Sequence, residues 1–395
     1  MARPSRPGRP PAPRINKLVL EVAEPCNLRC QYCYARPRTH GGGAARLMDP
    51  AAARQIVRRF LAGRESCALV QFFGGEPTLN LAAIEAAMEE AHALVEEGSL
   101  EAVPRFAVVT NGVFRDPGRT LELLARHEVE VTVSLDGPAS LHDALRPQAD
   151  GAPTFDRASR QVQALIEAGL TVAVEAVYTS RHVREGFSIV DLFQFCQKLD
   201  APRLVFDVAY PPAPEELNPL LDPYFDQTIE YFRDAVDWWC ESLLAGTNTP
   251  LRVYFQDLLR PLLEGMEAVR FAGTCAAAEG DFAVGPGGEL YACQLLYGEP
   301  EFALGNVLSG EYPGLRTPFP VGAQDMAECR DCFARSWCQP CVALNRSWGD
   351  AWHPPPRECQ LRRAVMGRLA AWAFDRLNVP DNDVTRPLRD AVMRA

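Results

Sequence analysis

Three cysteines stand close together near the start of the chain, in the run C-N-L-R-C-Q-Y-C that contains Cys26, Cys30 and Cys33. Thiolates at this spacing can converge on one metal centre. A structural zinc site takes four ligands, and so does a cubic iron–sulfur cluster. The run therefore predicts either zinc with a distant fourth ligand, or a [4Fe–4S] cluster whose open iron can bind a small chelating ligand.

A second set of cysteines lies in the last third of the chain and indicates further metal ligation. Its members are Cys275, Cys293, Cys329, Cys332, Cys338, Cys341 and Cys359. The run C-x2-C-x5-C-x2-C over 329–341 by itself suits zinc and iron–sulfur binding about equally. Cys67, Cys196 and Cys240 fit neither set, so we expect buried, inert thiols there. The six histidines form no H-x3-H or H-E-x-x-H pair, which argues against a zinc hydrolase.

The elements that must position the first cysteines alternate between strand and helix. Short apolar, β-branched runs predict six strands, at 18–23, 69–73, 105–110, 129–135, 170–178 and 203–210. Helical patterns separate them, at 50–62, 80–97, 118–127, 155–169 and 187–199. Asp49, before Pro50, is the expected N-cap of the first helix. This order predicts an α/β fold, a partial (β/α)6 barrel like an incomplete TIM barrel, with its site at the carboxyl ends of the strands.

The pattern changes after residue 210. Helices are expected at 222–246, 251–264 and 358–376, the first with an aromatic stripe typical of a core. From about 272 the chain is rich in Gly, Pro and Cys, which predicts a small region held by metal rather than by a core. The expected division is a disordered Pro/Arg-rich tail (1–14), the barrel (15–210), a helical bridge (211–271), a cysteine-rich domain with a C-terminal helix (272–376) and a tail (377–395).

Composition excludes several classes of function. The net charge of −11 disfavours a nucleic-acid partner, since such proteins are usually basic. No stretch of 18 apolar residues is present, so no membrane span is expected. The N-terminal residues lack the apolar region of a secretory signal, which predicts a cytoplasmic protein. Thiols stay reduced in that compartment, so the 13 cysteines point to metal rather than to disulfides.

The first cysteine run resembles the signature of the radical S-adenosylmethionine (SAM) superfamily, C-x3-C-x-aromatic-C after the opening strand, with Tyr32 as the aromatic residue. The resemblance implies that Cys26, Cys30 and Cys33 hold a [4Fe–4S] cluster whose open iron binds the amino and carboxylate groups of SAM. The reduced cluster would then cleave SAM, and the resulting 5′-deoxyadenosyl radical would abstract a hydrogen atom from the substrate. Zinc binding is the alternative.

Segments at the ends of the following strands extend this resemblance. The sequence F-G-G-E-P over 73–77 ends the second strand, and the matching family segment contacts the amino group of SAM. This implies SAM contacts at Gly74, Gly75 and Glu76. Ser134 resembles the family's ribose-contacting serine. Further candidate contacts, for which a turn, cap or surface role is the alternative, are Tyr32, Asn111, Asp136, Arg146 and Arg157.

The second cysteine set resembles the SPASM domain of peptide- and protein-modifying radical SAM enzymes. The pattern begins C-x12-G-x4-C at Cys275, Gly288 and Cys293, and it departs from the family where two residues rather than three separate Cys338 from Cys341. The resemblance implies two auxiliary clusters, which we expect to be of the [4Fe–4S] type. The outer would be held by Cys329, Cys332, Cys338 and Cys359, and the inner by Cys275, Cys293 and Cys341.

Together these resemblances imply an enzyme, a radical SAM/SPASM maturase that modifies a ribosomally made peptide, with crosslinking as the favoured product. An alternative is formylglycine formation of the sulfatase-maturating type. That group usually has an aspartate after the G-x4-C cysteine, where this chain has Gln294. An alternative of another class is a non-catalytic iron–sulfur scaffold or carrier, which would have no need for the first cysteine run together with G-G-E-P.

The expected partners follow from the same resemblance. They are a precursor peptide and an electron donor of the flavodoxin or ferredoxin type. Only about 14 residues precede the first strand, too few for a leader-binding winged helix. We therefore expect leader recognition through a separate protein, through residues 211–270, or not at all.

Overall fold

The computed structural model describes residues 14–35, 45–245, 255, 258–259, 277–278, 280–311, 326–335 and 337–377. Some residues for which the sequence makes a prediction lie outside these ranges. They are Cys275, the tails over 1–13 and 378–395, and most of the expected helix over 251–264. In the described part of the chain, no helix is both long and apolar enough to cross a bilayer.

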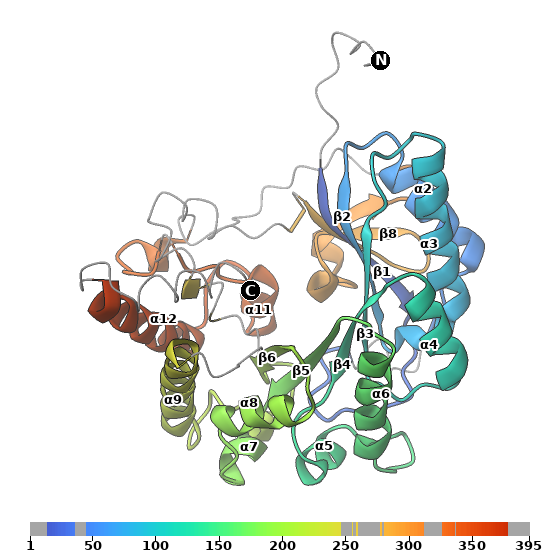
Figure 1. Ribbon diagram of the computed structural model, residues 1–395. Coiled ribbons are helices and arrows are strands. Elements are labelled where there is room, and N and C mark those ends of the chain that lie inside the picture. The colour runs from blue at the N-terminus through green and yellow to red at the C-terminus, as the bar shows by residue number, and fades with distance from the viewer. Residues whose placement is uncertain are drawn as a thin grey trace.

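Six parallel strands form a curved sheet whose order follows the chain, β6-β5-β4-β3-β2-β1. The strands are β1 (Ile15–Ala23), β2 (Cys67–Gly74), β3 (Arg105–Thr110), β4 (Glu130–Ser134), β5 (Val172–Tyr178) and β6 (Arg203–Val208). Figure 1 shows them curving around one side of the molecule. The α/β fold class expected from the sequence is confirmed, with each strand within a few residues of its predicted range.

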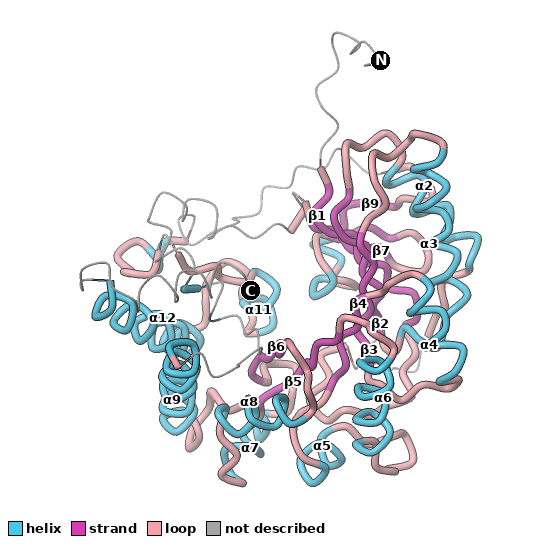
Figure 2. Tube along the Cα trace, viewed as in Figure 1, coloured by secondary structure: helices cyan, strands magenta, loops and turns pink. Residues whose placement is uncertain are grey.

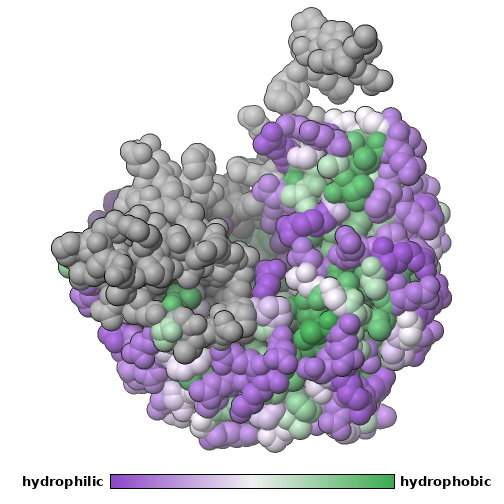
Figure 3. Space-filling view, in the orientation of Figure 1, coloured by the Kyte–Doolittle hydropathy of each residue, from purple (hydrophilic) through white to green (hydrophobic). Residues whose placement is uncertain are grey.

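Helices cover the convex side of this sheet (Figure 2). They are α2 (Pro50–Leu61), α3 (Leu81–Glu96), α4 (Pro117–Arg126), α6 (Phe155–Glu167) and α8 (Ile189–Lys198), while α5 (Ala139–Leu145) and α7 (Ser180–Arg184) follow the carboxyl ends of β4 and β5. The short helices α5 and α7 were not expected. The Asp49 side chain accepts from the backbone N–H of Ala51 and caps α2 as predicted. The outward faces of these helices are mostly hydrophilic (Figure 3), because the apolar face of each packs on the sheet.

Side chains along each strand point alternately to the two faces of the sheet. One face packs against the helices, and the other lines the concave side. On β6, Leu204, Phe206 and Val208 are buried against the helices. Val205 and Asp207 lie between them in sequence, point the other way and border a cavity on the concave side. The sheet therefore offers one face to the hydrophobic core and the other to the site.

The cysteine-rich segment continues the same sheet, which the sequence did not indicate. Strand β7 (Asp281–Val284) pairs in parallel with β1, and β8 (Glu289–Tyr291) and β9 (Ala303–Asn306) follow antiparallel. Phe282 is fully buried and its ring lies 5.3 Å from that of Phe60. The expectation of a region held by metal rather than by a core needs correction here, because these strands bury apolar side chains in the main core.

The remaining α-helices of the described structure are the short α11 (Val342–Ser347) and two long ones, α9 (Phe225–Leu244) and α12 (Pro356–Leu377). The two long helices lie side by side (Figure 1), and Arg368 of α12 forms an ion pair of 2.6 Å with Asp237 of α9. The expected aromatic stripe of α9 is part of the core, since Phe232 and Trp239 are each 2% exposed. This packing brings the C-terminal helix close to β6 and the concave side of the sheet.

Candidate active site

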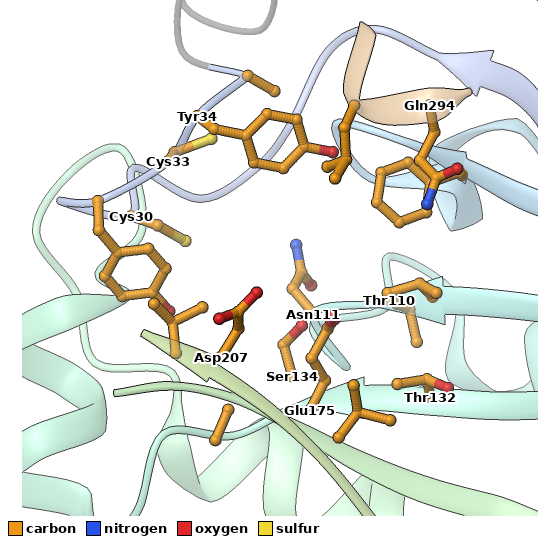
Figure 4. Close-up of a pocket in the computed structure, with 18 of the residues that line it drawn as sticks. Cys30, Cys33, Tyr34, Thr110, Asn111, Thr132, Ser134, Glu175, Asp207 and Gln294 are labelled. Carbon is orange, nitrogen blue, oxygen red and sulfur yellow. The ribbon is translucent and has the colours of Figure 1, made fainter. Parts of the chain in front are cut away.

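A cavity of about 470 Å³ occupies the concave side of the sheet. Cys26, Cys30 and Cys33 border it from the loop that follows β1. Figure 4 shows Cys30 and Cys33 there. No other cysteine of the described residues lines it. Three soft sulfur donors around an open space suit an iron–sulfur cluster with one free iron, which is the group the sequence pattern predicts. In the described ranges, no three His, Cys, Asp or Glu side chains stand close enough to hold a single metal ion.

The cysteine loop is held in place by a distant segment. The backbone N–H of Arg29 donates to the carbonyl of Pro147 at 2.8 Å, and that of Gln31 to the carbonyl of Leu145 at 2.9 Å. Burial raises the pKa of Cys30 to about 12, as it does for Cys26, where the nearby Glu76 adds to the effect. These thiols therefore need a bound cation to become the thiolates that ligate metal.

A fully buried carboxylate anchors the aromatic residue of the cysteine run. Asp136 Oδ2 accepts from the Tyr32 hydroxyl at 2.5 Å and from Arg146 Nε at 2.9 Å, while Oδ1 accepts from the backbone N–H of Val177 at 3.0 Å. The Arg146 guanidinium also stands 5.2 Å from the centre of the Tyr32 ring. We call Tyr32, Asp136 and Arg146 the buried triad. It ties the cysteine loop to the ends of β4 and β5.

Two histidines enclose the buried triad. Nδ1 of His142 accepts from the backbone N–H of Asp136 at 3.3 Å, and Nε2 of His182 lies 2.7 Å from the Asp136 carbonyl oxygen. Burial lowers the pKa of His142 to about 4, and burial also lowers the pKa of His182. Both rings are thus neutral at physiological pH, so they add no charge to the ion pair of Asp136 and Arg146.

The glycine pair after β2 lies directly on the backbone that precedes the cysteines. Gly74 has a positive φ of 137°, and a Cβ built on it would stand 2.2 Å from the carbonyl oxygen of Ala23. A Cβ on Gly75 would stand 2.4 Å from the carbonyl oxygen of Glu24. Only glycine permits this approach, so the second strand's end and the cysteine loop form one surface of the cavity.

Substituting Gly75 tests this close approach. We expect Gly75→Ala to lower the free energy of unfolding by about 1–3 kcal/mol, because the new methyl group collides with fixed backbone atoms. SAM binding should weaken as well, since the cysteine loop must move. Urea denaturation measures the first effect and isothermal calorimetry the second. Gly118→Ala is the control, because its Cβ would meet nothing closer than 3.8 Å. Equal behaviour of the two variants would contradict the interpretation.

The carboxylate of Glu76 faces the protein rather than the cavity. It accepts hydrogen bonds from the backbone N–H groups of Thr78 and Asn111, and from the hydroxyl groups of Thr78 and Thr110. The residue is completely buried, and burial raises its pKa. These bonds join the ends of β2 and β3, so the carboxylate shapes the rim of the site while the backbone of Gly74 and Gly75 lines it.

The second cysteine set falls into two groups. In the first group, burial raises the pKa of Cys329, and the charges of Cys338 and Cys332 raise it further. The pKa of Cys359 is raised to about 11, mainly by burial and then by the charges of Cys329 and Cys338. The four thiols thus influence one another electrostatically, although no three of the described His, Cys, Asp or Glu side chains stand close enough to hold a single metal ion. In the second group, Cys341 and Cys293 both influence Tyr210, which lines the cavity and whose pKa is raised mainly by burial.

Comparison with known proteins shows which family model and which relatives this chain is similar to. Residues 20–185 match the model of the radical SAM superfamily. The chain contains a radical SAM domain. It is 26% identical to a cysteine-type anaerobic sulfatase-maturating enzyme of Clostridium perfringens over 389 residues, 94% of this chain and 99% of the relative. It is also 26% identical to the mycofactocin maturase MftC of Mycobacterium tuberculosis, over 87% of this chain and 82% of the relative.

Solved structures share the fold of the radical SAM domain and of the C-terminal segments beyond it. The structure of anSMEcpe with bound AdoMet matches with a TM-score of 0.75 and 22% identity, over 96% of this chain and 99% of that one. Streptococcus suis SuiB bound to its precursor peptide SuiA matches at 0.58 and 17%, over 88% and 76%. These structures show the shared fold. The radical SAM domain recognised from the sequence is confirmed by the family match, and the relatives that align with most of the chain are named as maturating enzymes.

The predicted SAM contacts of the radical SAM domain lie in different places. Asn111 and Ser134 border the cavity, and Asn111 Nδ2 donates to Asn27 Oδ1 at 2.8 Å beside the cysteines. Arg157 does not line it. Its guanidinium donates instead to the carbonyl of Phe114 at 3.1 Å and to the Gln148 side chain at 3.3 Å. The individual contacts stay predictions, with Arg146 the arginine that lies at the cavity.

The sequence did not indicate a second polar cluster, which links the radical SAM domain to the cysteine-rich segment. Glu24, two residues before Cys26, accepts from the Tyr297 hydroxyl at 2.8 Å and from Arg46 Nη2 at 2.6 Å. Arg46 also pairs with Glu289. These residues are far apart in the chain, and no local motif could have revealed them. The cluster fixes the cysteine loop against the segment after Cys293.

Proposed function

We propose that this protein is a radical SAM/SPASM maturase that abstracts hydrogen from a peptide residue and thereby modifies a ribosomally made peptide. One observation carries the proposal. Cys26, Cys30 and Cys33 border the same cavity as the glycine pair of β2 and the ends of β3 and β4, inside a chain whose residues 20–185 match the superfamily. Crosslinking is our favoured product.

The residues around the cavity would have separate tasks. Cys26, Cys30 and Cys33 would hold a [4Fe–4S] cluster, which would supply the electron for reductive cleavage of SAM. The buried triad holds the cysteine loop, and Gly74 and Gly75 let the backbone approach SAM. Ser134 provides a hydroxyl group for the ribose.

The cysteine-rich segment would hold the two auxiliary clusters, in line with the two groups into which its cysteines fall. An electron donor of the flavodoxin or ferredoxin type would reduce the enzyme. A separate protein or residues 211–270 would recognise a leader sequence. We infer a cytoplasmic location, because reduced thiols are needed for cluster binding.

A second candidate is formylglycine formation on a sulfatase-type peptide. The match to the sulfatase-maturating enzyme of C. perfringens over 94% of this chain favours it. Gln294 argues against it, because an amide cannot accept a proton as the expected aspartate would. Gln294 lines the cavity, so its identity bears directly on the substrate.

Deoxyadenosine formation tests the proposal. The anaerobically reconstituted protein is reduced with dithionite in the presence of SAM, with and without the Cp18Cys peptide or SuiA, and products are analysed by mass spectrometry. We expect 5′-deoxyadenosine, together with a peptide of altered mass. Replacement of the cysteine sulfur by an aldehyde oxygen, with sulfide released, would favour formylglycine formation. An internal crosslink, in which each joined residue loses a hydrogen atom and no sulfur, would favour the precursor-peptide interpretation. Absence of deoxyadenosine from an iron-loaded protein would support the iron–sulfur scaffold, and zinc in place of iron would support the zinc alternative.

The outer group of the second cysteine set allows a separate prediction. We expect the variant Cys329→Ala with Cys332→Ala to lose iron and to unfold at lower temperature, because metal binding there contributes folding free energy. Deoxyadenosine formation without peptide should persist. Iron analysis and thermal unfolding measure the effect, and Cys67→Ala serves as the control outside both sets. Unchanged iron content and thermal stability would count against ligation by these residues.

A further inference from the structure

The two residues before Cys26 are held by backbone contacts on both sides. The backbone N–H of Glu76 donates to the Pro25 carbonyl at 3.0 Å, and the backbone N–H of Glu24 donates to the Arg46 carbonyl at 2.9 Å. Pro25 fixes its own φ and restricts the conformation of the residue before it. A displacement of Glu24 is therefore passed on to Cys26 rather than absorbed by the chain between them.

The carboxylate of Glu24 has a hydrogen-bond donor at each oxygen. Oε1 accepts from the Tyr297 hydroxyl at 2.8 Å and from Arg46 Nη2 at 2.6 Å, and Oε2 accepts from the backbone N–H of Arg46 at 2.8 Å. The Tyr297 oxygen in turn accepts from Arg46 Nη2 at 2.9 Å. Glu24 is 9% exposed and does not border the cavity. Its carboxylate is thus engaged within the protein, where it holds the chain that leads to Cys26.

The cysteine-rich segment sets the position of the Tyr297 hydroxyl. Tyr297 follows the short helix η4 (Gln294–Leu296), whose N-cap is Cys293. Its ring lies 5.2 Å from that of Tyr291 on β8, at an angle of 81°. A Cβ on Gly285, in the turn between β7 and β8, would stand 2.5 Å from the hydroxyl oxygen. The hydroxyl group therefore has little room to move, and one helical turn connects it to Cys293.

Contacts thus lead from a predicted ligand of the second cysteine set to a predicted ligand of the first. We propose that Tyr297 is a positioning residue for SAM cleavage, and that it acts on Cys26 through Glu24. The inference rests on the radical SAM chemistry of the proposed function. Tyr297 holds the cysteine loop in the geometry that cleavage needs, while the residues of the cavity wall bind SAM. The cysteine-rich segment is in this way a part of the SAM-cleaving site itself.

The variant Tyr297→Phe tests this role, because it removes the hydroxyl group and keeps the ring. The anaerobically reconstituted protein is incubated with SAM and dithionite, without peptide. We expect kcat for 5′-deoxyadenosine formation to fall about tenfold, since cleavage requires close alignment of the reacting groups. KM for SAM should change by less than about twofold, because the cavity wall still binds it. The iron content should equal that of the wild type.

Tyr178→Phe is the matched control. Tyr178 is fully buried, its hydroxyl donates to the Phe187 carbonyl at 2.6 Å, and it does not border the cavity. The two variants should lose similar thermal stability, while Tyr178→Phe keeps the wild-type kcat. Hydrogen–deuterium exchange of the reconstituted protein without SAM gives a readout apart from activity. Exchange over residues 24–31 should be about tenfold faster in Tyr297→Phe and unchanged in Tyr178→Phe.

A double variant shows whether Tyr297 acts through Glu24. Glu24→Ala leaves Arg46 its ion pair with Glu289, so the fold should persist. Glu24→Ala should lower kcat at least as much as Tyr297→Phe does. Adding Tyr297→Phe to Glu24→Ala should then cause no further loss, because the contact through which Tyr297 acts is already absent.

Each result decides for or against this role. The inference is overturned if Tyr297→Phe matches Tyr178→Phe in kcat and in exchange, or if the two losses multiply in the double variant. A fall in kcat that only follows a fall in iron content also overturns it. If the wild type itself forms no deoxyadenosine, the proposed function fails and this inference fails with it. Normal deoxyadenosine formation with unaltered peptides would remove only the peptide modification.

Discussion

Simultaneous replacement of Cys26, Cys30 and Cys33 by alanine is expected to reduce 5′-deoxyadenosine formation to background. With no thiolate to hold it, the cluster cannot deliver an electron to SAM. Iron bound by the second cysteine set should remain, so the iron content falls without reaching zero. Liquid chromatography of the quenched reaction and iron analysis of the same sample measure the two effects.

The fold of this triple variant should survive. The three cysteines are only partly buried, and backbone hydrogen bonds to Leu145 and Pro147 hold their loop. Circular dichroism therefore checks that the loss is chemical. Cys67→Ala, a buried cysteine outside both sets, is the matched control and should form deoxyadenosine at the wild-type rate. Deoxyadenosine from the triple variant would remove the basis for assigning these residues.

The second large effect is expected at the buried triad. Arg146 is 7% exposed and Asp136 is 0% exposed. Removing the guanidinium in Arg146→Met leaves an uncompensated buried charge, which should lower the free energy of unfolding by about 3–5 kcal/mol. Although burial raises it, the pKa of Asp136 is held below its usual range by Arg146. In the variant this support is lost. Tyr32 keeps Asp136 as its hydrogen-bond acceptor but loses the guanidinium beside its ring.

A double variant separates charge from packing. Arg146→Met with Asp136→Asn removes both charges, so it should recover part of the lost stability. Urea denaturation measures all three proteins. Arg105→Met is the control, because Arg105 pairs with Glu130 at a surface position where an ion pair contributes about 0–1 kcal/mol. Equal losses for Arg146→Met and Arg105→Met would show that the triad does not hold the loop.

Local patterns in the sequence were sufficient for much of the framework. Alternation and β-branched residues located the six strands of the curved sheet, and Asp49 before Pro50 marked the start of α2. Spacing alone grouped Cys26, Cys30 and Cys33, since ligands a few residues apart can meet without a long-range contact. The strands β7 to β9 were missed because each has only three or four residues, too few for a periodic pattern.

Tertiary structure decided which polar groups meet at the site. Tyr32 and Asp136 are 104 residues apart in the chain, and Tyr297 and Glu24 are 273 apart, so no local motif predicts either hydrogen bond. Glu76 matched a motif, yet four donors from β3 and its own turn direct its carboxylate into the protein. Asp207 is one polar residue in a strand by sequence, and only the curvature of the sheet places it in the cavity with Gln294. The sequence set the types of ligand and the order of the strands, whereas register and curvature set the distances between residues far apart in the chain.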